Sequence, residues 1–200
     1  MGKGRLEIFS DGVLAIIITI MVLELRAPHE TTLAALRPLL PVLLSYVLSF
    51  VYLGIYWNNH HHMLYCTHRV TGGILWANLY LLFWLSLVPF VTAWMGENPL
   101  ASVPTALYGV VLLMAGIAYW NLQRLILRSE GPHSVLAAAV SGEIKGKLSP
   151  LLYFLAIGAA FVHPLIAYGL YILGALLWLI PDRRIEQALA RAEPGPTAAE

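Results

Sequence analysis

Long apolar runs divide this chain into blocks that a soluble domain does not contain. Four blocks cover residues 12–25, 39–57, 73–95 and 103–122, and a longer stretch covers residues 149–180. A membrane-spanning helix needs about 20 apolar residues, and none of these blocks alternates apolar with polar positions as the strand of a membrane barrel does. The pattern therefore predicts an all-α integral membrane protein.

The last apolar stretch is long enough to form two helices. His163 and Pro164 lie near its middle, and a proline disfavours helical backbone at the residue before it. Division at this point gives six spans in total, and we predict a six-transmembrane-helix bundle. Each half of the stretch is short, so a single long kinked span is the alternative.

Composition agrees with a membrane protein and excludes several other classes. Hydrophobic residues make up 59% of the 200 and charged residues 12%, whereas soluble domains have roughly 45–50% and about 25%. Twelve basic residues against eleven acidic ones give a net charge of +1, which is too little for a nucleic-acid-binding surface. The single cysteine, Cys66, excludes a disulfide scaffold. No nucleophile-elbow, zinc-protease or P-loop motif indicates an enzyme.

Lysine and arginine residues predict the orientation of the chain. The cytoplasmic loops of membrane proteins are enriched in these residues. With six spans, ten of the twelve fall on the side of the N-terminus, and only Arg26 and Arg37 fall on the other side. We therefore expect both termini in the cytoplasm. The ten residues are Lys3, Arg5, Arg69, Arg124, Arg128, Lys145, Lys147, Arg183, Arg184 and Arg191.

The chain contains one predicted domain and a short tail. Residues 1–192 hold all the spans without a tandem repeat, and we expect them to form a single transmembrane domain. Residues 193–200 are rich in proline, alanine and glycine and predict a disordered C-terminal tail. Residues 134–144 are weakly amphipathic, which indicates a short helix at the membrane surface.

The segment that leads into the first span carries the most specific motif. Residues 5–11 have the pattern R-x-x-x-F-S-D. This pattern resembles the signature at the start of the first helix in the transmembrane protein 175 family, which comprises endosomal and lysosomal potassium channels and their bacterial relatives. Residues 56–61, Y-W-N-N-H-H, resemble the tryptophan and histidine cluster of that family, and residues 178–184 resemble its final helix and exit.

The resemblance implies a function and an assembly. It implies a cation channel that passes K⁺ and other monovalent cations, with no cofactor. Animal members of the family carry two six-helix repeats and assemble as dimers, whereas bacterial relatives carry one repeat and assemble as tetramers. Because this chain has one repeat, the resemblance implies a homotetramer in a prokaryotic plasma membrane, with four first helices around a central pore.

The first helix offers a candidate pore lining. Ile16, Thr19, Ile20 and Leu23 share one stripe about 100° wide on a helical wheel. The resemblance implies that the stripe faces the pore and that Ile16 forms the narrowest constriction; packing against other helices is the alternative. The chain lacks the T-V-G-Y-G segment that supplies carbonyl ligands in common potassium filters, so we expect a hydrophobic constriction. Glu24 either forms a carboxylate ring at the outer mouth or lies at a solvated end of the helix.

A polar network is expected beside that stripe. Asp11 lies about 140° from Ile16 on the wheel, which turns it towards the neighbouring helices. The second helix returns to the same membrane side and offers Trp57, His60 and His61 as partners. The alternatives are that Asp11 caps its helix and that the histidines lie at a solvated interface. Adjacent helical side chains point about 100° apart, so neighbouring histidines do not chelate one ion and we expect no metal site. The motif residues assigned to this network are Arg5, Phe9, Ser10 and Asp11.

A small secondary transporter of cations or small solutes is the alternative function. Transporters commonly place ionisable groups and broken helices near the membrane midplane. Residues 39–58 and 75–95 contain no charged side chain. This absence favours the channel over the transporter.

Overall fold

Helices make up all the regular structure of the described chain, which comprises residues 2–132, 134, 136–137 and 145–179 of a computed structural model. Two 3₁₀ helices, η1 and η2, lie in the connection between the first two α-helices. The bounds are α1 (Lys3–Met21), η1 (Val22–Glu24), η2 (Leu33–Leu39), α2 (Leu40–Tyr65), α3 (Gly72–Ser86), α4 (Val88–Glu97), α5 (Ser102–Glu130), α7 (Lys145–Val162) and α8 (Pro164–Leu179).

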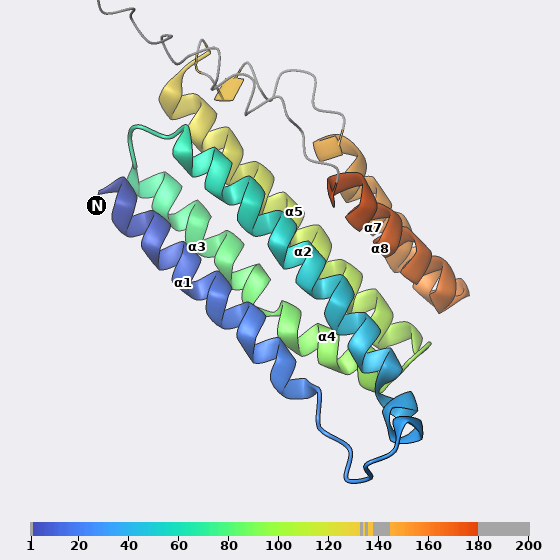
Figure 1. Cartoon of the computed structure of the whole chain (residues 1–200). Coiled ribbons are helices and arrows are strands. Elements are labelled where there is room, and N and C mark those ends of the chain that lie inside the picture. The colour runs from blue at the N-terminus through green and yellow to red at the C-terminus, as the bar shows by residue number, and fades with distance from the viewer. Residues whose placement is uncertain (1, 133, 135, 138–144, 180–200) are drawn as a thin grey trace, which may run out of the picture.

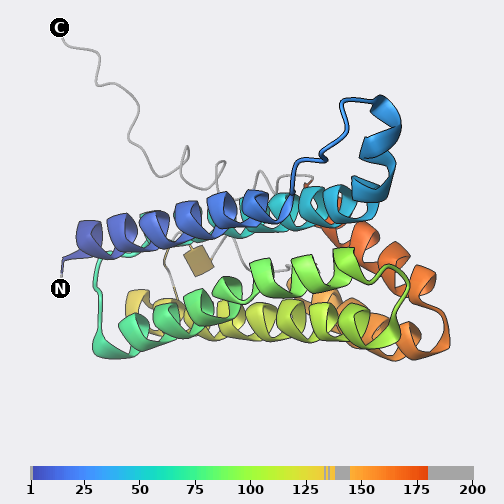
Figure 2. The same ribbon diagram turned by 90° about the horizontal axis from the view of Figure 1, so that it is seen from below.

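The helices form two layers and a lateral hairpin. Figure 2 shows α1 and α2 above α3, α4 and α5, and the contacts of α1 with α3 and of α2 with α4 join the two layers. The α7–α8 hairpin packs against α5 and α2. In Figure 1, α1 lies at the edge of the bundle opposite this hairpin, and the described residues leave much of its surface exposed.

The predicted membrane protein class is confirmed. Within the described residues, four helical segments are long and apolar enough to cross a bilayer, and α7 and α8 contribute two shorter apolar helices. Their continuous helical hydrogen bonds satisfy the backbone where lipid offers no partners. The four long segments are Lys3–Glu24, Leu33–Tyr65, Gly72–Glu97 and Ser102–Glu130.

The division at His163 is also confirmed, and the single kinked span is wrong. α7 ends at Val162, and α8 starts at Pro164 and folds back along α7. Proline suits the first position of a helix because its missing N–H would have no intrahelical partner there. The two helices therefore form an antiparallel hairpin.

The third predicted span consists of two helices and not one. α3 ends at Ser86 and α4 begins at Val88, with Leu87 between them. Pro89, the second residue of α4, has no N–H to continue the ladder and its ring crowds the preceding turn. The Leu87 N–H donates to Trp84 O at 3.3 Å, which closes α3 with a tight turn.

Buried hydroxyl groups join the helices within the core. Tyr52 Oη donates to the carbonyl of Tyr171 at 2.7 Å and links α2 to α8. Ser49 Oγ lies 2.7 Å from Thr92 Oγ1 and 3.0 Å from Tyr108 Oη, which links α2 to α4 and α5. Such bonds give membrane helices specific contacts where apolar packing alone competes with lipid.

Several predicted features lie outside the described residues. The C-terminal tail, Arg183, Arg184 and Arg191 belong to this part of the sequence, as does most of the segment 134–144 for which a surface helix is predicted. These remain predictions from the sequence.

Candidate functional site

α1 presents two chemically different faces. Ile16 and Leu23 are 58% and 73% exposed, whereas Leu14 and Ile17 are only 1% and 4% exposed. The structure thus places Ile16, Thr19 and Ile20 on one exposed face of α1, beside α4, and Leu23 continues this face in η1. The side chains of the buried face are Leu6, Ser10, Leu14, Ile17 and Met21.

A buried chain of hydrogen bonds connects α1, α3 and α2. Asn78 Nδ2 donates to Ser10 Oγ at 2.9 Å, and Ser10 Oγ donates to the carbonyl of Leu6 at 2.8 Å. Asn78 Oδ1 lies 2.7 Å from His60 Nε2. Because the Asn78 amide nitrogen is already used by Ser10, its oxygen must accept, and His60 must carry its proton on Nε2. Each member therefore has a defined role as donor or acceptor.

Asp11 makes its contact with α2 at the exposed rim of this network. Trp57 Nε1 donates to Asp11 Oδ1 at 3.1 Å, and the His61 ring stacks on Trp57 with 6.1 Å between ring centroids. Of the three partners expected for Asp11, Trp57 is the one that binds it. His60 instead faces α3 and pairs with Asn78, since it lies one helical turn beyond Trp57 and is almost fully buried.

The remaining two motif residues lie outside this network in the described part of the chain. Arg5 and Phe9 are exposed and make no side-chain hydrogen bond, ion pair or ring contact with the described residues. Arg5 lies about 140° from Ser10 around the helix, which directs it away from α2 and α3. Lys3 ties the start of α1 to α2 instead, because its Nζ donates to the carbonyl of Tyr65 at 2.7 Å.

A groove of about 700 Å³ separates the exposed stripe of α1 from α4. Ile16 and Ile20 line one wall and Phe90 lies on the opposite wall. Glu24 and Glu97 both line this groove, where α1 continues into η1 and where α4 ends. The predicted position of Glu24 at the end of the stripe therefore has a second carboxylate nearby, which the sequence pattern did not indicate.

The described part of the chain contains no cluster that suits a metal ion: nowhere in it do three His, Cys, Asp or Glu side chains converge. Cys66 is buried at the end of α2, and this burial raises the pKa of its thiol. Glu130, at the end of α5, accepts hydrogen bonds from the His68 backbone at 2.7 Å and from His68 Nδ1 at 2.8 Å. This contact fixes the loop between α2 and α3 and has no catalytic arrangement around it.

Comparison with known proteins identifies the family of this chain. Residues 5–89 match the family model described as the endosomal/lysosomal potassium channel TMEM175. A potassium channel from Chryseobacterium sp. (strain P1-3) is 54% identical over 189 residues, which cover 94% of this chain and 98% of the relative. A potassium channel from Streptomyces collinus is 34% identical over 84% of this chain and 88% of its own length.

A solved structure shares the fold. The crystal structure of a lysosomal potassium-selective channel TMEM175 homolog from Chamaesiphon minutus superposes with a TM-score of 0.78 at 27% identity. The match covers 90% of this chain and 97% of that one. This chain and the Chamaesiphon channel therefore share the helical arrangement over nearly their full lengths. The Chryseobacterium protein is in addition similar in sequence, at 54% identity. The chain belongs to the TMEM175 family.

Proposed function

We propose that this chain is one subunit of a potassium channel, in which α1 from four copies lines a central pore for K⁺. The relatives from Chryseobacterium, Streptomyces and Chamaesiphon are named potassium channels, and the first of them is 54% identical to this chain. Family membership also argues against an enzyme. The exposed face of α1 is the observation that carries the assignment of the pore.

The chemistry of that face suits a pore better than contact with lipid. Lipid-facing positions are apolar, because an ionisable side chain is costly at membrane depth. The exposed stripe instead joins Ile16 to Thr19 on α1, and η1 continues it with Leu23 and Glu24. α1 also lies at an open edge of the protomer (Figure 1), where further copies and a water-filled path can cover it.

A ring of Ile16 side chains would act as a hydrophobic constriction. Isoleucine offers no oxygen ligand, so an ion passes hydrated or loses water at a cost of several kcal/mol. Thr19 is the nearest polar member of the stripe, and its hydroxyl donates to the carbonyl of Ile16 at 3.0 Å. Because the Thr19 hydroxyl donates its proton to this carbonyl, the lone pairs of its oxygen can face a cation in the pore. Ile20 and Leu23 continue the apolar lining, and Glu24 attracts cations at the outer mouth.

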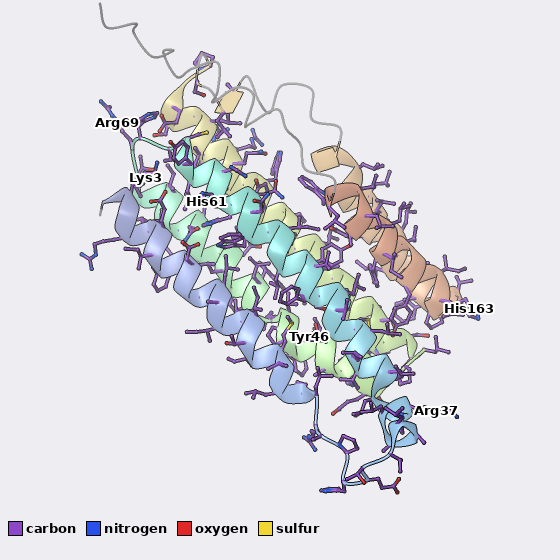
Figure 3. All side chains as sticks on the ribbon, viewed as in Figure 1. Lys3, Arg37, Tyr46, His61, Arg69 and His163 are labelled. Atoms are coloured by element: carbon purple, nitrogen blue, oxygen red, sulfur yellow. The ribbon has the colours of Figure 1, made fainter. Side chains whose placement is uncertain are left out.

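The positions of the charged residues support cytoplasmic termini. In Figure 3, Lys3 and Arg69 lie at one end of the bundle and Arg37 lies at the other. Arg124 and Arg128 lie in the last two turns of α5, which ends at Glu130. Glu130 accepts a hydrogen bond from the backbone N–H of Arg69, so this end of α5 lies at the same end of the bundle as Arg69. This grouping follows the enrichment of basic residues on the cytoplasmic side of membranes.

Potassium flux into liposomes tests the proposal. The purified protein should carry K⁺ without a coupled ion, in proportion to the driving force. Ile16→Asn should raise the flux about tenfold, because a carboxamide ring keeps the constriction wet and removes roughly 1.4 kcal/mol of barrier. Ile166→Asn is the matched control, since Ile166 on α8 is 51% exposed and lies on the hairpin opposite α1.

Each result has one interpretation. Equal flux in Ile16→Asn and the wild type would remove Ile16 from the constriction. Flux that saturates at low substrate and requires a second ion would show a transporter. The mass of the reconstituted assembly, measured in parallel by native mass spectrometry, should be four times that of one chain.

A further inference from the structure

A second cavity lies on the far side of α2 from α1. It has a volume of about 60 Å³ and is bounded by α2, α5, α7 and α8. Trp120 lines it and is 52% exposed, so the cavity reaches the surface of the protomer. Asn59 lies six residues before the end of α2, which places the cavity about 9 Å from that end of the helix. This depth corresponds to the boundary between the hydrocarbon and the headgroups.

Two polar side chains in this cavity lack a hydrogen-bond partner among the described residues. The Gln123 side chain is only 9% exposed, yet its amide makes no hydrogen bond to any described residue. Tyr56 Oη is likewise without a hydrogen bond among the described residues, and it lies 3.8 Å from the place where a Cβ on Gly116 would stand. Buried polar groups are satisfied in the great majority of cases, by protein, water or ligand. Both groups are therefore available to an occupant.

The walls select for a neutral occupant. None of the described residues that line the cavity is acidic or basic, and aromatic rings make up much of the wall. The guanidinium of Arg124 stacks on the Trp120 ring, 4.5 Å from its centroid. This positive charge beside the entrance opposes a cationic ligand, and none of the described side chains inside the cavity is a cation that would pair with an anion. A cavity of this volume holds about two water molecules, or the polar end of a larger molecule.

We propose that this cavity binds the polar end of a small neutral amphiphile, with a hydroxyl or a primary carboxamide as its head and an alkyl chain as its tail. Both heads carry a donor and an acceptor, which matches the amide of Gln123 and the hydroxyl of Tyr56. The alkyl chain would lie along Tyr119, Tyr153 and Trp178 towards the opening. The occupant would connect the α7–α8 hairpin to α2 and α5, and its binding does not require ion conduction.

Photolabelling of the purified full-length chain tests this site. The probe is an octanol that carries a diazirine, and mass spectrometry locates the modified residues. Labelling should be saturable and should fall on residues of the cavity such as Tyr56 and Tyr153. An excess of 1-octanol should abolish it, whereas octylammonium, which has the same chain and a positive head, should not.

Three variants separate binding from simple partition into the micelle. Gln123→Leu keeps the size of the side chain and removes its hydrogen bonds, so the affinity should fall roughly tenfold. Gly116→Leu fills the cavity and should remove the saturable labelling. Gly158→Leu is the matched control, because a Cβ on Gly158 meets nothing within 4 Å and Gly158 lies outside the cavity. Its labelling should equal that of the wild type.

The proposal fails on any of several results. Labelling that does not saturate, or that is spread evenly over lipid-facing residues, would show partition only. Equal competition by 1-octanol and octylammonium would remove the argument from charge. Unchanged saturable labelling in Gln123→Leu or in Gly116→Leu would place the probe elsewhere. The elution volume in size-exclusion chromatography confirms that each variant is folded before it is labelled.

Discussion

The buried network of Ser10, Asn78 and His60 makes a quantitative prediction about the attachment of α1. Asn78→Leu removes both hydrogen bonds at once while it keeps a similar volume. Ser10 retains its bond to Leu6, but His60 Nε2–H, on a side chain only 2% exposed, loses its acceptor. A buried donor left without a partner costs about 1–3 kcal/mol. Within a membrane the average is lower, near 0.6 kcal/mol per bond, since freed groups find other partners.

These values place the loss for Asn78→Leu at about 2 kcal/mol in the free energy of unfolding. His60→Leu should cost about 1 kcal/mol, because Asn78 keeps its bond to Ser10. The double variant should lose only about 1 kcal/mol, because neither partner is then left unpaired and replacement of both partners is close to neutral. The two substitutions should therefore show a coupling of about 2 kcal/mol.

Unfolding in mixed micelles with rising SDS content, followed by tryptophan fluorescence, measures all four proteins of the cycle. Asn121→Leu serves as the control, because Asn121 is an exposed asparagine on α5 with no side-chain partner among the described residues. Its unfolding free energy should change by less than about 0.5 kcal/mol. If the losses of the two single variants simply add in the double variant, the hydrogen bond between His60 and Asn78 contributes nothing and the reasoning is refuted.

Two further predictions concern packing and reactivity. A Cβ on Gly96 would stand 2.8 Å from Val42 Cα, so Gly96→Ala must push α4 away from α2 and should lower the unfolding free energy by about 1–3 kcal/mol in the same assay. Gly169→Ala is the control and should leave the unfolding free energy unchanged, because a Cβ there meets nothing within 4 Å. Equal losses in the two variants would contradict the close approach of α4 to α2. Cys66 is buried, and burial raises the pKa of its thiol, so little thiolate exists at pH 7.5. Maleimide should therefore modify Cys66 at least tenfold more slowly in the native protein than in the SDS-unfolded protein. Equal rates would contradict the burial of this side chain.

The sequence alone was sufficient for the helical class, the division at His163 and the positions of most helices, because these follow from hydrophobic length and from proline. The break between α3 and α4 was not predicted, because it lies inside the single span expected over residues 73–95. Pro89 is visible in the sequence, but a proline within a membrane helix produces either a kink or a break, and the neighbouring helices decide between them. Here the Ser49, Thr92 and Tyr108 hydroxyls hold α4 in its own position against α2 and α5.

The partners of polar residues were harder to predict than the residues themselves. Asp11, Trp57 and His60 stand out because polar groups in an apolar run require partners. Asn78 lies in the third predicted span, where its sequence neighbours give no hint of α1 or α2. The pairing depends on which helices are adjacent, and sequence periodicity carries no information about adjacency.

The arrangement of α1 links these observations to conduction. Its first turns are held by specific bonds from Lys3, Ser10 and Asp11, which fix the position and rotation of the helix on α2 and α3. Its later turns pack by apolar contact on one side and border the groove of α4 on the other. A helix that is anchored at one end and only packed at the other can tilt at its packed end without breaking a hydrogen bond. The stripe that begins at Ile16 belongs to this second half, so under the proposed function the constriction lies in the part of α1 that apolar packing alone holds against the other described helices.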